Sequence, residues 1–462
     1  MNGAPGPGSG LTSRDIGRGL RLSIVEGVFA NGHLALTGGM FLTGLALFLG
    51  ASPFQMGLLA AVPALTASFG FLSTLLVRRI GSRRKLVVWT GGLGKAVFIA
   101  LVPFLATRSR VGLGLFFGVV VAYNVLMAVA NTTWNSWMSD LVPEDRRGRF
   151  LGLRNAVLGG VVMLLTYGAG RFMDRLEPAD LELGYALAFG AAVLLGIIAS
   201  VMLAYQPEPA LVSRPRVPLR ERLLGPLLEE PQFRRMMIFL GAWFLTGTMA
   251  SPFYMAHLLT NLEFSFAHVG VYAVLGGTTG LLFQLLWGWL IDRFGPKPVT
   301  LVCFGLVGFM PLLWIVATPA FRLPIWIDGV LNGVAWTGAN LGMLNMILGL
   351  GDNPVRKESY FATFSVVVGL ATFAASLAGG VIAQALQGLS GNVFGVRLVN
   401  YHPLFLVTGL ARFACLPLLV RVQERRSRRV VRTLRVLGSF ALRRLGYGKG
   451  VFLQALRARS RG

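Results

Sequence analysis

Long apolar runs alternate with short polar segments along almost the whole chain. Each run is about 20 residues long, the length that an α-helix needs to cross the hydrocarbon core of a bilayer. The intervening segments contain Gly, Pro and charged residues, which favour loops. The pattern predicts an all-α membrane protein whose twelve spans are 23–48, 53–77, 86–106, 111–138, 156–173, 184–204, 236–260, 268–291, 299–318, 324–350, 360–386 and 403–421.

Composition excludes several other classes of protein. Of the 462 residues, 54% are hydrophobic and only 13% are charged, whereas this length in a soluble protein would indicate about three domains. Cys303 and Cys415 both lie in apolar runs, so no disulfide framework is expected. The chain lacks a Gly-x-x-x-x-Gly-Lys-Ser/Thr loop, a His-Glu-x-x-His motif and paired intramembrane carboxylates. We therefore expect no enzyme activity, no ATP-driven pump, no cofactor and no metal site.

The chain has a net charge of +24, and its basic residues are unevenly distributed. They concentrate in alternate loops, namely 78–85, 139–155, 205–235, 292–298 and 351–359. Loop 174–183 on the other side is instead acidic. Because basic loops stay on the cytoplasmic side, we predict a multi-pass protein of a bacterial-type cytoplasmic (inner) membrane with both ends in the cytoplasm, and no nucleic-acid partner.

Both ends of the chain are polar. Residues 1–22 form a predicted cytoplasmic tail, and the span that follows is expected to act as an uncleaved signal anchor. The tail 422–462 is strongly basic: from Arg421 onward there are thirteen bases and one acid, Glu424. Interspersed Val and Leu residues indicate an amphipathic segment that lies on anionic lipid. The alternative is a disordered cationic tail that only reinforces the topology.

The loop Gly288–Pro298 joins two apolar runs and carries Asp292, Arg293, Gly295 and Lys297. It resembles the Gly-x-x-x-Asp-Arg-x-Gly-x-Lys loop of the major facilitator superfamily of secondary transporters. Loop 139–155 is similar to the Pro-x-x-x-Arg-Gly loop between spans four and five of bacterial members. A drug-antiporter signature is missing, and Arg79-x-Gly81-x-Arg83-Arg84 only hints at a sugar-porter pattern, so no subfamily is assigned.

The two halves of the chain also resemble each other, at an offset of 211–214 residues. Gln55-Met56-Gly57 aligns with His268-Val269-Gly270, and the segment 143–150 aligns with 354–361. This agrees with the superfamily resemblance, which implies two pseudo-symmetric six-helix bundles, 23–204 and 236–421, joined by the cytoplasmic linker 205–235. The resemblance further implies a midplane site lined by spans 1, 4, 7 and 10, with alternating access to the two sides.

The same resemblance implies a cytoplasmic gate. In the first half, Arg78 stands where the second half has Asp292, and Glu358 stands where the first half has Arg147. We therefore hypothesise swapped charges, with Asp292 facing the region 146–154 and Arg78 facing Glu358 when that side is closed. The expected gate residues are Asp292, Arg293, Gly295, Arg78, Arg147, Arg149 and Glu358. The alternative is that these are solvated loop charges, worth less than about 1 kcal/mol each.

Polar residues inside the spans are the candidate binding residues, because polar groups in a bilayer are expensive. Glu26, His33 and Thr37 share one face of the first span, and Glu26 and His33 are the candidates for proton coupling. The alternatives are a salt bridge from Glu26 to loop arginines and a packing role for His33. Further candidates are Asn124, Asn131 and Asn135 in span 4, His257 in span 7, Gln284 in span 8, and Asn332, Trp336 and Asn340 in span 10.

Other roles remain open for several of these residues. The i, i+4 spacing of Asn332, Trp336 and Asn340 predicts an amide–indole–amide ladder on one helix face, but Asn also joins helices in membranes. If His257 lies near the outer end of its span, it is a solvated histidine. Lys95 and Arg412 lie in spans that are peripheral in the superfamily. We expect them to snorkel to the headgroups or to pair with a neighbouring helix.

The combined interpretation is a monomeric secondary transporter of a small neutral or amphipathic solute. Proton coupling is favoured because Glu26 and His33 could both titrate. Export is favoured because the cavity is expected to be apolar and amide-lined, with few carboxylates and arginines. A nutrient-uptake permease and a non-transporting sensor or scaffold with the same fold are the alternatives.

Swapped gate charges make a specific prediction. Reversing the charge of Arg78 or of Glu358 alone should weaken the gate, and reversing both together should restore the lost activity, because the attraction is re-formed with opposite signs. Transport by the single and double variants measures this. A double reversal that restores nothing contradicts the pairing.

Overall fold

The computed structural model describes residues 11–107, 112–143, 146–176, 180–211, 219–350, 354–389, 391–393 and 396–423; for 219–220, 222, 354–358, 393 and 396–397 it describes the backbone alone. The predicted amphipathic tail from 424 onward and the side chain of Glu358 therefore lie outside the described residues.

Nearly all of the described chain is helical. The first half contains α1 (Ser13–Thr37), α2 (Gly39–Phe48), α3 (Pro53–Thr66), the 3-10 turn η1 (Ala67–Phe71), α4 (Leu72–Ile80), α5 (Arg83–Ala96), the 3-10 turn η2 (Val97–Ala100), α6 (Val102–Ala106), α7 (Leu113–Leu141), α8 (Arg147–Leu176) and α9 (Leu181–Ala204). The rest contains α10 (Leu219–Glu229), α11 (Pro231–Thr248), α12 (Ser251–Thr260), α13 (Phe266–Phe294), α14 (Pro296–Val316), α15 (Leu323–Leu348), α16 (Pro354–Ala385), the strands β1 (Gly391–Val393) and β2 (Val396–Leu398), and α17 (His402–Val420).

These elements form the twelve predicted spans. Within the described residues, ten helical segments are long and apolar enough to cross a membrane, and α1 with α2, together with α15, complete the set. The bounds differ from the prediction most at the starts of four spans. The fifth span, α8, begins at Arg147 rather than at 156, and the eleventh, α16, begins at Pro354 rather than at 360. The first helix begins at Ser13 rather than at 23, where Thr12 and Asp15 form a capping box. The seventh span begins at Pro231 rather than at 236.

Local signals fix where several helices begin and end. Ser52 caps α3 and Ser265 caps α13, each through its side-chain oxygen, and these serines are equivalent in the two halves. At the other ends, Gly81 follows α4 with φ +73° and Gly295 follows α13 with φ +91°. A residue with a Cβ is disfavoured in these conformations, so the glycines account for the tight turns predicted there.

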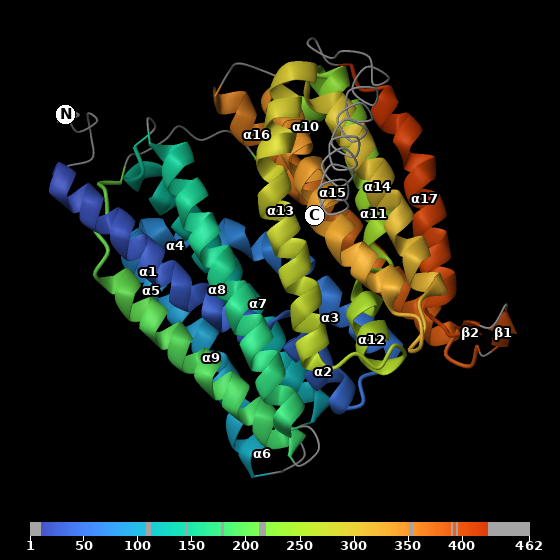
Figure 1. The fold of residues 1–462 in the computed structure, drawn as a ribbon. Coiled ribbons are helices and arrows are strands. Elements are labelled where there is room, and N and C mark those ends of the chain that lie inside the picture. Colours follow the sequence, from blue (N-terminus) through green and yellow to red (C-terminus); the bar gives the residue numbers. More distant parts are fainter. Residues whose placement is uncertain are drawn as a thin grey trace, which may run out of the picture.

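The helices are arranged in two halves (Figure 1), α1–α9 and α11–α17, with α10 in the connection between them. We call the end of the molecule that carries segments 78–85, 139–149 and 292–297 the basic end, and the other end the opposite end. The halves lie against each other toward the opposite end and diverge toward the basic end, as the ribbons of α8 and α13 show (Figure 1).

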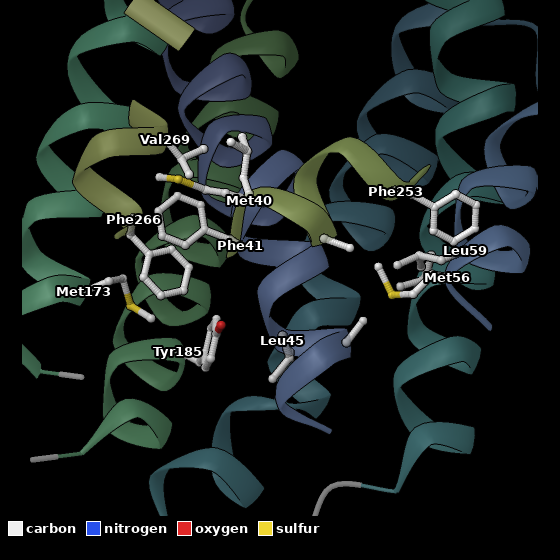
Figure 2. Close-up of a cluster of buried hydrophobic side chains, with 14 of the residues drawn as sticks. Met40, Phe41, Leu45, Met56, Leu59, Met173, Tyr185, Phe253, Phe266 and Val269 are labelled. Atoms are coloured by element: carbon white, nitrogen blue, oxygen red, sulfur yellow. The ribbon is translucent and has the colours of Figure 1, made fainter. Parts of the chain in front are cut away.

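One hydrophobic core at the opposite end contains residues of both halves. Figure 2 shows Phe41, Met40 and Tyr185 of the first half beside Phe266 and Val269 of the second half. The rings of Phe41 and Phe266 are stacked with their centroids 6.3 Å apart. The apolar packing at this end therefore joins the two halves directly.

At the basic end, each half has its own core. One core contains only residues of the second half, such as Phe233, Phe294 and Tyr360. A smaller one contains only residues of the first half, such as Trp137 and Leu203. Among the described residues, no buried apolar cluster crosses between the halves here. The structure is thus closed at the opposite end and open at the basic end.

Glycines bring the two halves into backbone contact at the closed end. A Cβ on Gly57 of α3 would lie 2.5 Å from Ser376 O and 2.7 Å from Gly380 Cα of α16. A Cβ on Gly170 of α8 would lie 2.6 Å from Phe266 O of α13. These distances are too short for any side chain, so glycine is required at both helix contacts. We call the contact between α3 and α16 and the contact between α8 and α13 the two seams.

Two hydrogen bonds of the same kind also cross the seams. The N–H of Ala267, at the start of α13, donates to Asp174 Oδ2 of α8 at 3.0 Å. The N–H of Phe54, at the equivalent position of α3, donates to Gln384 Oε1 of α16 at 3.4 Å. Each half thereby satisfies a free N–H group at a helix start of the other half.

Enlarging Gly57 should open the seam between α3 and α16. We expect a Gly57→Val variant carrying Ser376→Cys to react about tenfold faster with a membrane-impermeant maleimide from the side of the opposite end, because its closed state loses over 1 kcal/mol. Natural Cys303 and Cys415 are buried and give little background. Gly118→Val is the matched control, since nothing lies within 4 Å of a Cβ at Gly118. Equal labelling of the two variants contradicts the prediction.

Candidate substrate-binding site

A pocket of about 240 Å³ lies inside the first half. It contains three of the predicted residues, Glu26 and His33 on α1 and Asn131 on α7. Leu34 and Asn131 are its exposed lining residues and mark its mouth. The remaining lining residues are Ala30, Asn31, Val87, Gly91, Lys95, Tyr123, Met127, Ala130, Trp134, Arg154 and Leu203.

Three charged side chains line this pocket. Glu26 is 4% exposed, and its Oε2 lies 3.6 Å from Arg154 Nη2, which is an ion pair without a hydrogen bond. Arg154 is held by Ser23 O at 3.2 Å from Nε, and its guanidinium lies 4.7 Å from the ring centre of Trp134. The predicted salt bridge of Glu26 to a loop arginine is therefore present, but it forms the wall of a pocket.

The expectation that Lys95 snorkels to the headgroups is wrong, and Lys95 forms no ion pair or hydrogen bond with a described residue of a neighbouring helix either. Lys95 is 4% exposed and faces the pocket that contains Glu26. Gly196 on α9 makes room for it, since a Cβ there would lie 2.7 Å from Lys95 Cβ. The interior of the first half is thus more highly charged than its sequence indicated.

His33 occupies an aromatic corner of the same pocket. Its Nδ1 lies 2.9 Å from Ala192 O, and its ring contacts Phe98 and Tyr123. Nε2 is buried without a hydrogen-bond partner among the described residues. A ring held by one nitrogen leaves the other available, so His33 combines a packing role with a free polar atom at the pocket.

A second pocket, of about 400 Å³, lies where α8 of the first half meets α13 and α15 of the second half. The predicted ladder of Asn332, Trp336 and Asn340 lies on its wall, and so does Gln284. Glycines of α13 and α15 allow the backbones of these two helices to come into contact, and they add no side chains to the wall of the pocket. The remaining lining residues are Gly159, Met163, Gly276, Gly277, Gly280, Leu281, Gly333 and Thr337.

Four other predicted residues lie outside both pockets, namely Thr37, Asn124, Asn135 and His257. Thr37 is buried and donates to His33 O at 2.8 Å. Asn124 donates to Val120 O of its own helix at 2.8 Å. Asn135 is exposed beyond the pocket that contains Asn131. Helical spacing alone placed the first three on the same faces as the pocket residues, but depth along the helix separates them.

His257 is not the solvated histidine that its position in the span suggested. It is 1% exposed and packs with His402 of α17, whose ring centre is 5.2 Å away, and with Tyr401 and Trp314. Neither ring nitrogen of His257 has a hydrogen-bond partner among the described residues. It belongs to a buried aromatic cluster in the second half, outside both pockets.

A buried charged group in the second half escaped the sequence analysis. Asp328 of α15 is 1% exposed, and its Oδ2 accepts a hydrogen bond from Tyr272 of α13 at 2.6 Å. Arg412 is also buried rather than snorkelling. It donates from Nη1 to Val307 O at 3.0 Å and from Nη2 to Gly247 O at 3.1 Å. Its guanidinium also lies 5.9 Å from the ring centre of Trp336, which connects it to the second pocket.

The predicted gate residues lie apart at the open end. Arg78, Asp292 and Arg293 are exposed, and Arg293 lies over the Trp289 ring at 5.4 Å. Among the described side chains, Asp292 makes no ion pair with the region 146–154. Arg147 instead donates to Ser139 O at 2.8 Å. The swapped pairs were predicted for a closed basic end, so they stay a prediction.

Arg83 is the centre of a network of polar contacts at the basic end, and the sequence analysis did not single it out as a site residue. It donates to Asp140 Oδ2 at 2.6 Å and to Pro209 O at 3.2 Å, and its own N–H donates to Glu208 Oε1 at 2.5 Å. This network ties α5 to α7 and to the segment after α9. It holds the basic end of the first half together as one unit.

Two helical halves joined at one end, with pockets between and beside them, define a membrane transport protein. A sequence profile of the Major Facilitator Superfamily matches residues 27–259 and 236–456. The chain belongs to the major facilitator superfamily of membrane transporters.

Solved structures with the same fold belong to transporters of different substrates. A mutant of the nucleoside transporter NupG is 13% identical, with a TM-score of 0.65 over 87% of this chain and 100% of that chain. The D-xylose–proton symporter is 14% identical, with a TM-score of 0.65 over 89% and 98% of the two chains. A bacterial homologue of the iron transporter ferroportin, in an inward-facing state, is 13% identical, with a TM-score of 0.63 over 90% and 100%. No curated protein matches the sequence.

Removing Arg412 should destabilise the second half. We expect Arg412→Met to lower the free energy of unfolding by about 2–4 kcal/mol, because two backbone carbonyls lose a charged donor and buried Asp328 loses a nearby positive charge. Reversible unfolding in mixed detergent measures this. Arg322→Met is the control, because Arg322 is only partly buried and donates to a single carbonyl, Glu263 O, at 3.1 Å.

The double variant Arg412→Met/Asp328→Asn separates electrostatic from structural loss. If the two charges compensate each other, the double variant should lose about 1 kcal/mol less than the sum of the single variants. Strict additivity shows that Arg412 acts through its backbone contacts alone.

Proposed function

We propose that this protein is a secondary transporter that moves a small solute by alternating access. The observation that carries the proposal is the arrangement of the two halves, which share one apolar core at the opposite end and have separate cores at the basic end. Exchanging which end is packed requires rocking of the halves, while the fold of each half is kept.

The basic end is proposed to face the cytoplasm. Segments 78–85, 139–149 and 292–297 carry ten bases, whereas Asp174, Asp180 and Glu182 lie at the opposite end. Positively charged loops remain on the cytoplasmic side of a membrane. The conformation is then inward-open, and both ends of the chain lie in the cytoplasm of a bacterial-type cell.

The domain division proposed from the sequence follows the same arrangement. The first half, 23–204, carries the charged pocket, and the second half, 236–421, carries the amide ladder. The linker 205–235 contains α10, which packs on α16 through the hydrogen bond from Thr363 Oγ1 to Leu223 O at 2.9 Å. The same linker also contacts the first half, because Glu208 and Pro209 accept hydrogen bonds from Arg83, so it joins the two halves at the basic end.

Solute binding is proposed between the two pockets. Asn332, Trp336, Asn340 and Gln284 offer amide hydrogen bonds and one indole face to a ligand. Proton coupling is proposed for Glu26, whose carboxylate lines the other pocket and has Oε2 without a hydrogen bond. A buried carboxylate that meets the substrate cavity is the kind of group that proton-coupled carriers use.

Export is the direction that we propose, because an amide-lined groove with exposed leucine at its edge suits a solute drawn from the cytoplasm or the inner leaflet. Leu281 lines the second pocket and is 44% exposed. Accumulation of the solute inside proteoliposomes whose protein faces inside-out supports export, and uptake in the opposite orientation overturns it.

A ligand screen tests the site. The melting temperature of the purified protein is measured with a panel of lipids, drugs, sugars, nucleosides and amino acids, since a specific ligand stabilises the folded state by mass action. We expect the shift of any hit to fall by at least about half in Asn332→Ala/Asn340→Ala, which removes two of the amides that face the pocket.

The matched control for this screen is Asn345→Ala. Asn345 is on the same helix but donates to Leu341 O of its own turn at 2.8 Å, outside the pocket. A hit whose shift falls equally in the control and in the double variant places the solute elsewhere.

A further inference from the structure

The pocket of the first half carries an unequal set of charges. Glu26 supplies one carboxylate, whereas Lys95 and Arg154 supply two cations, and no other described charged side chain lines the pocket. Lys95 and Glu26 are each 4% exposed. The pocket therefore has one positive charge in excess, at a depth where uncompensated charge is expensive.

Neither cation is fully engaged by the protein. Arg154 donates from Nε to Ser23 O, but its closest approach to Glu26 is 3.6 Å, beyond a normal hydrogen bond. Lys95 Nζ makes no hydrogen bond to any described residue, and no salt bridge among them includes it. The two donors that bind carboxylates and phosphates best thus remain available inside one cavity.

The other walls suit an organic group. Trp134 and Tyr123 present aromatic surface, and Asn31 and Asn131 present amides near the mouth. Trp134 is already covered on one side by Arg154. A ligand with a compact anionic group and a flat or apolar body complements this pocket. Its anionic group would contact the two bases, and its apolar body would contact the aromatic rings.

We propose that the pocket between Lys95 and Arg154 binds the anionic group, a carboxylate or a phosphate monoester, of a small organic substrate. This inference rests on the proposed transport function and replaces the neutral solute that the sequence favoured. An anion between the two bases takes over the charge compensation that Glu26 provides. Its binding therefore depends on the charge of Glu26.

The test compares two probes of the same shape and different charge. Benzoate and benzamide are titrated by calorimetry into the purified full-length protein in neutral detergent. We expect benzoate to bind at least about tenfold more tightly than benzamide, because a charge-assisted contact is worth more than 1.4 kcal/mol in a buried site. Phenyl phosphate in a parallel titration shows which of the two anionic groups the pocket prefers.

Two substitutions should change benzoate affinity in opposite directions. Lys95→Gln removes the excess charge and should abolish the preference for benzoate over benzamide. Glu26→Gln removes the competing carboxylate and should raise benzoate affinity several-fold. General unfolding cannot raise the affinity, so the gain in Glu26→Gln keeps the test valid even if Lys95→Gln folds poorly.

Lys85→Gln is the matched control. Lys85 is on the same helix as Lys95 and carries the same charge, but it is exposed at the basic end. It should leave both affinities unchanged. Equal binding of benzoate and benzamide to the wild-type protein overturns the proposal, and so does a Glu26→Gln variant with unchanged or weaker benzoate binding.

Reconstitution distinguishes failure of this inference from failure of the proposed function. Proteoliposomes that transport a neutral solute, with no preference for benzoate over benzamide, retain the transporter and reject the anion site. Benzoate binding that follows the predicted pattern, without transport of any organic anion, retains the anion site and rejects the transporter.

Discussion

The packing of the two halves at the opposite end is the interaction on which the rest of this structure depends. Within a bilayer, apolar side chains gain nothing by leaving lipid for protein, so close backbone contact must hold the helices together. Gly57 and Gly170 provide that contact, and Phe41 and Phe266 fill the space around it. No ion pair among the described residues crosses this seam, and Asp174, which accepts a hydrogen bond from Ala267, is a charged group that its separation would expose.

The seam also uses the internal symmetry of the chain, and departs from it in one respect. Phe54 and Ala267 occupy equivalent positions at the starts of α3 and α13, and each donates its N–H to a side chain of the other half. One acceptor is the neutral amide of Gln384 and the other is the carboxylate of Asp174. A carboxylate at a helix start is favoured by the helix dipole as well as by the hydrogen bond. The hydrogen bond between α8 and α13 is therefore the stronger of these two.

Buried charge is distributed differently in the two halves. In the second half, Arg412 donates to two backbone carbonyls, and Asp328 accepts from Tyr272, so each group is held by the protein itself. In the first half, Lys95 and Arg154 face a cavity with only Glu26 between them. The first arrangement stabilises a bundle, whereas the second leaves a positive charge available to a ligand. The difference supports a structural role for the first set and the proposed binding role for the second.

The sequence by itself determined the number of spans, the alternation of basic loops, the two-half repeat and the turns at Gly81 and Gly295. The spans, the basic loops and the turns depend on patterns within about 30 residues of chain, which helix periodicity and turn residues reveal directly, whereas the repeat appears only when the two halves are aligned. The same periodicity placed Asn332, Trp336 and Asn340 on one face of one pocket. Only the tertiary structure brought Glu26, Lys95 and Arg154 together, because they lie on α1, α5 and α8, and nothing local encodes which faces of these helices meet. It also decided that Lys95, His257 and Arg412 are buried, since depth and neighbours depend on the packing of helices far apart in the chain. Finally, the closed end was decided by contacts between halves about 210 residues apart, which no local pattern specifies.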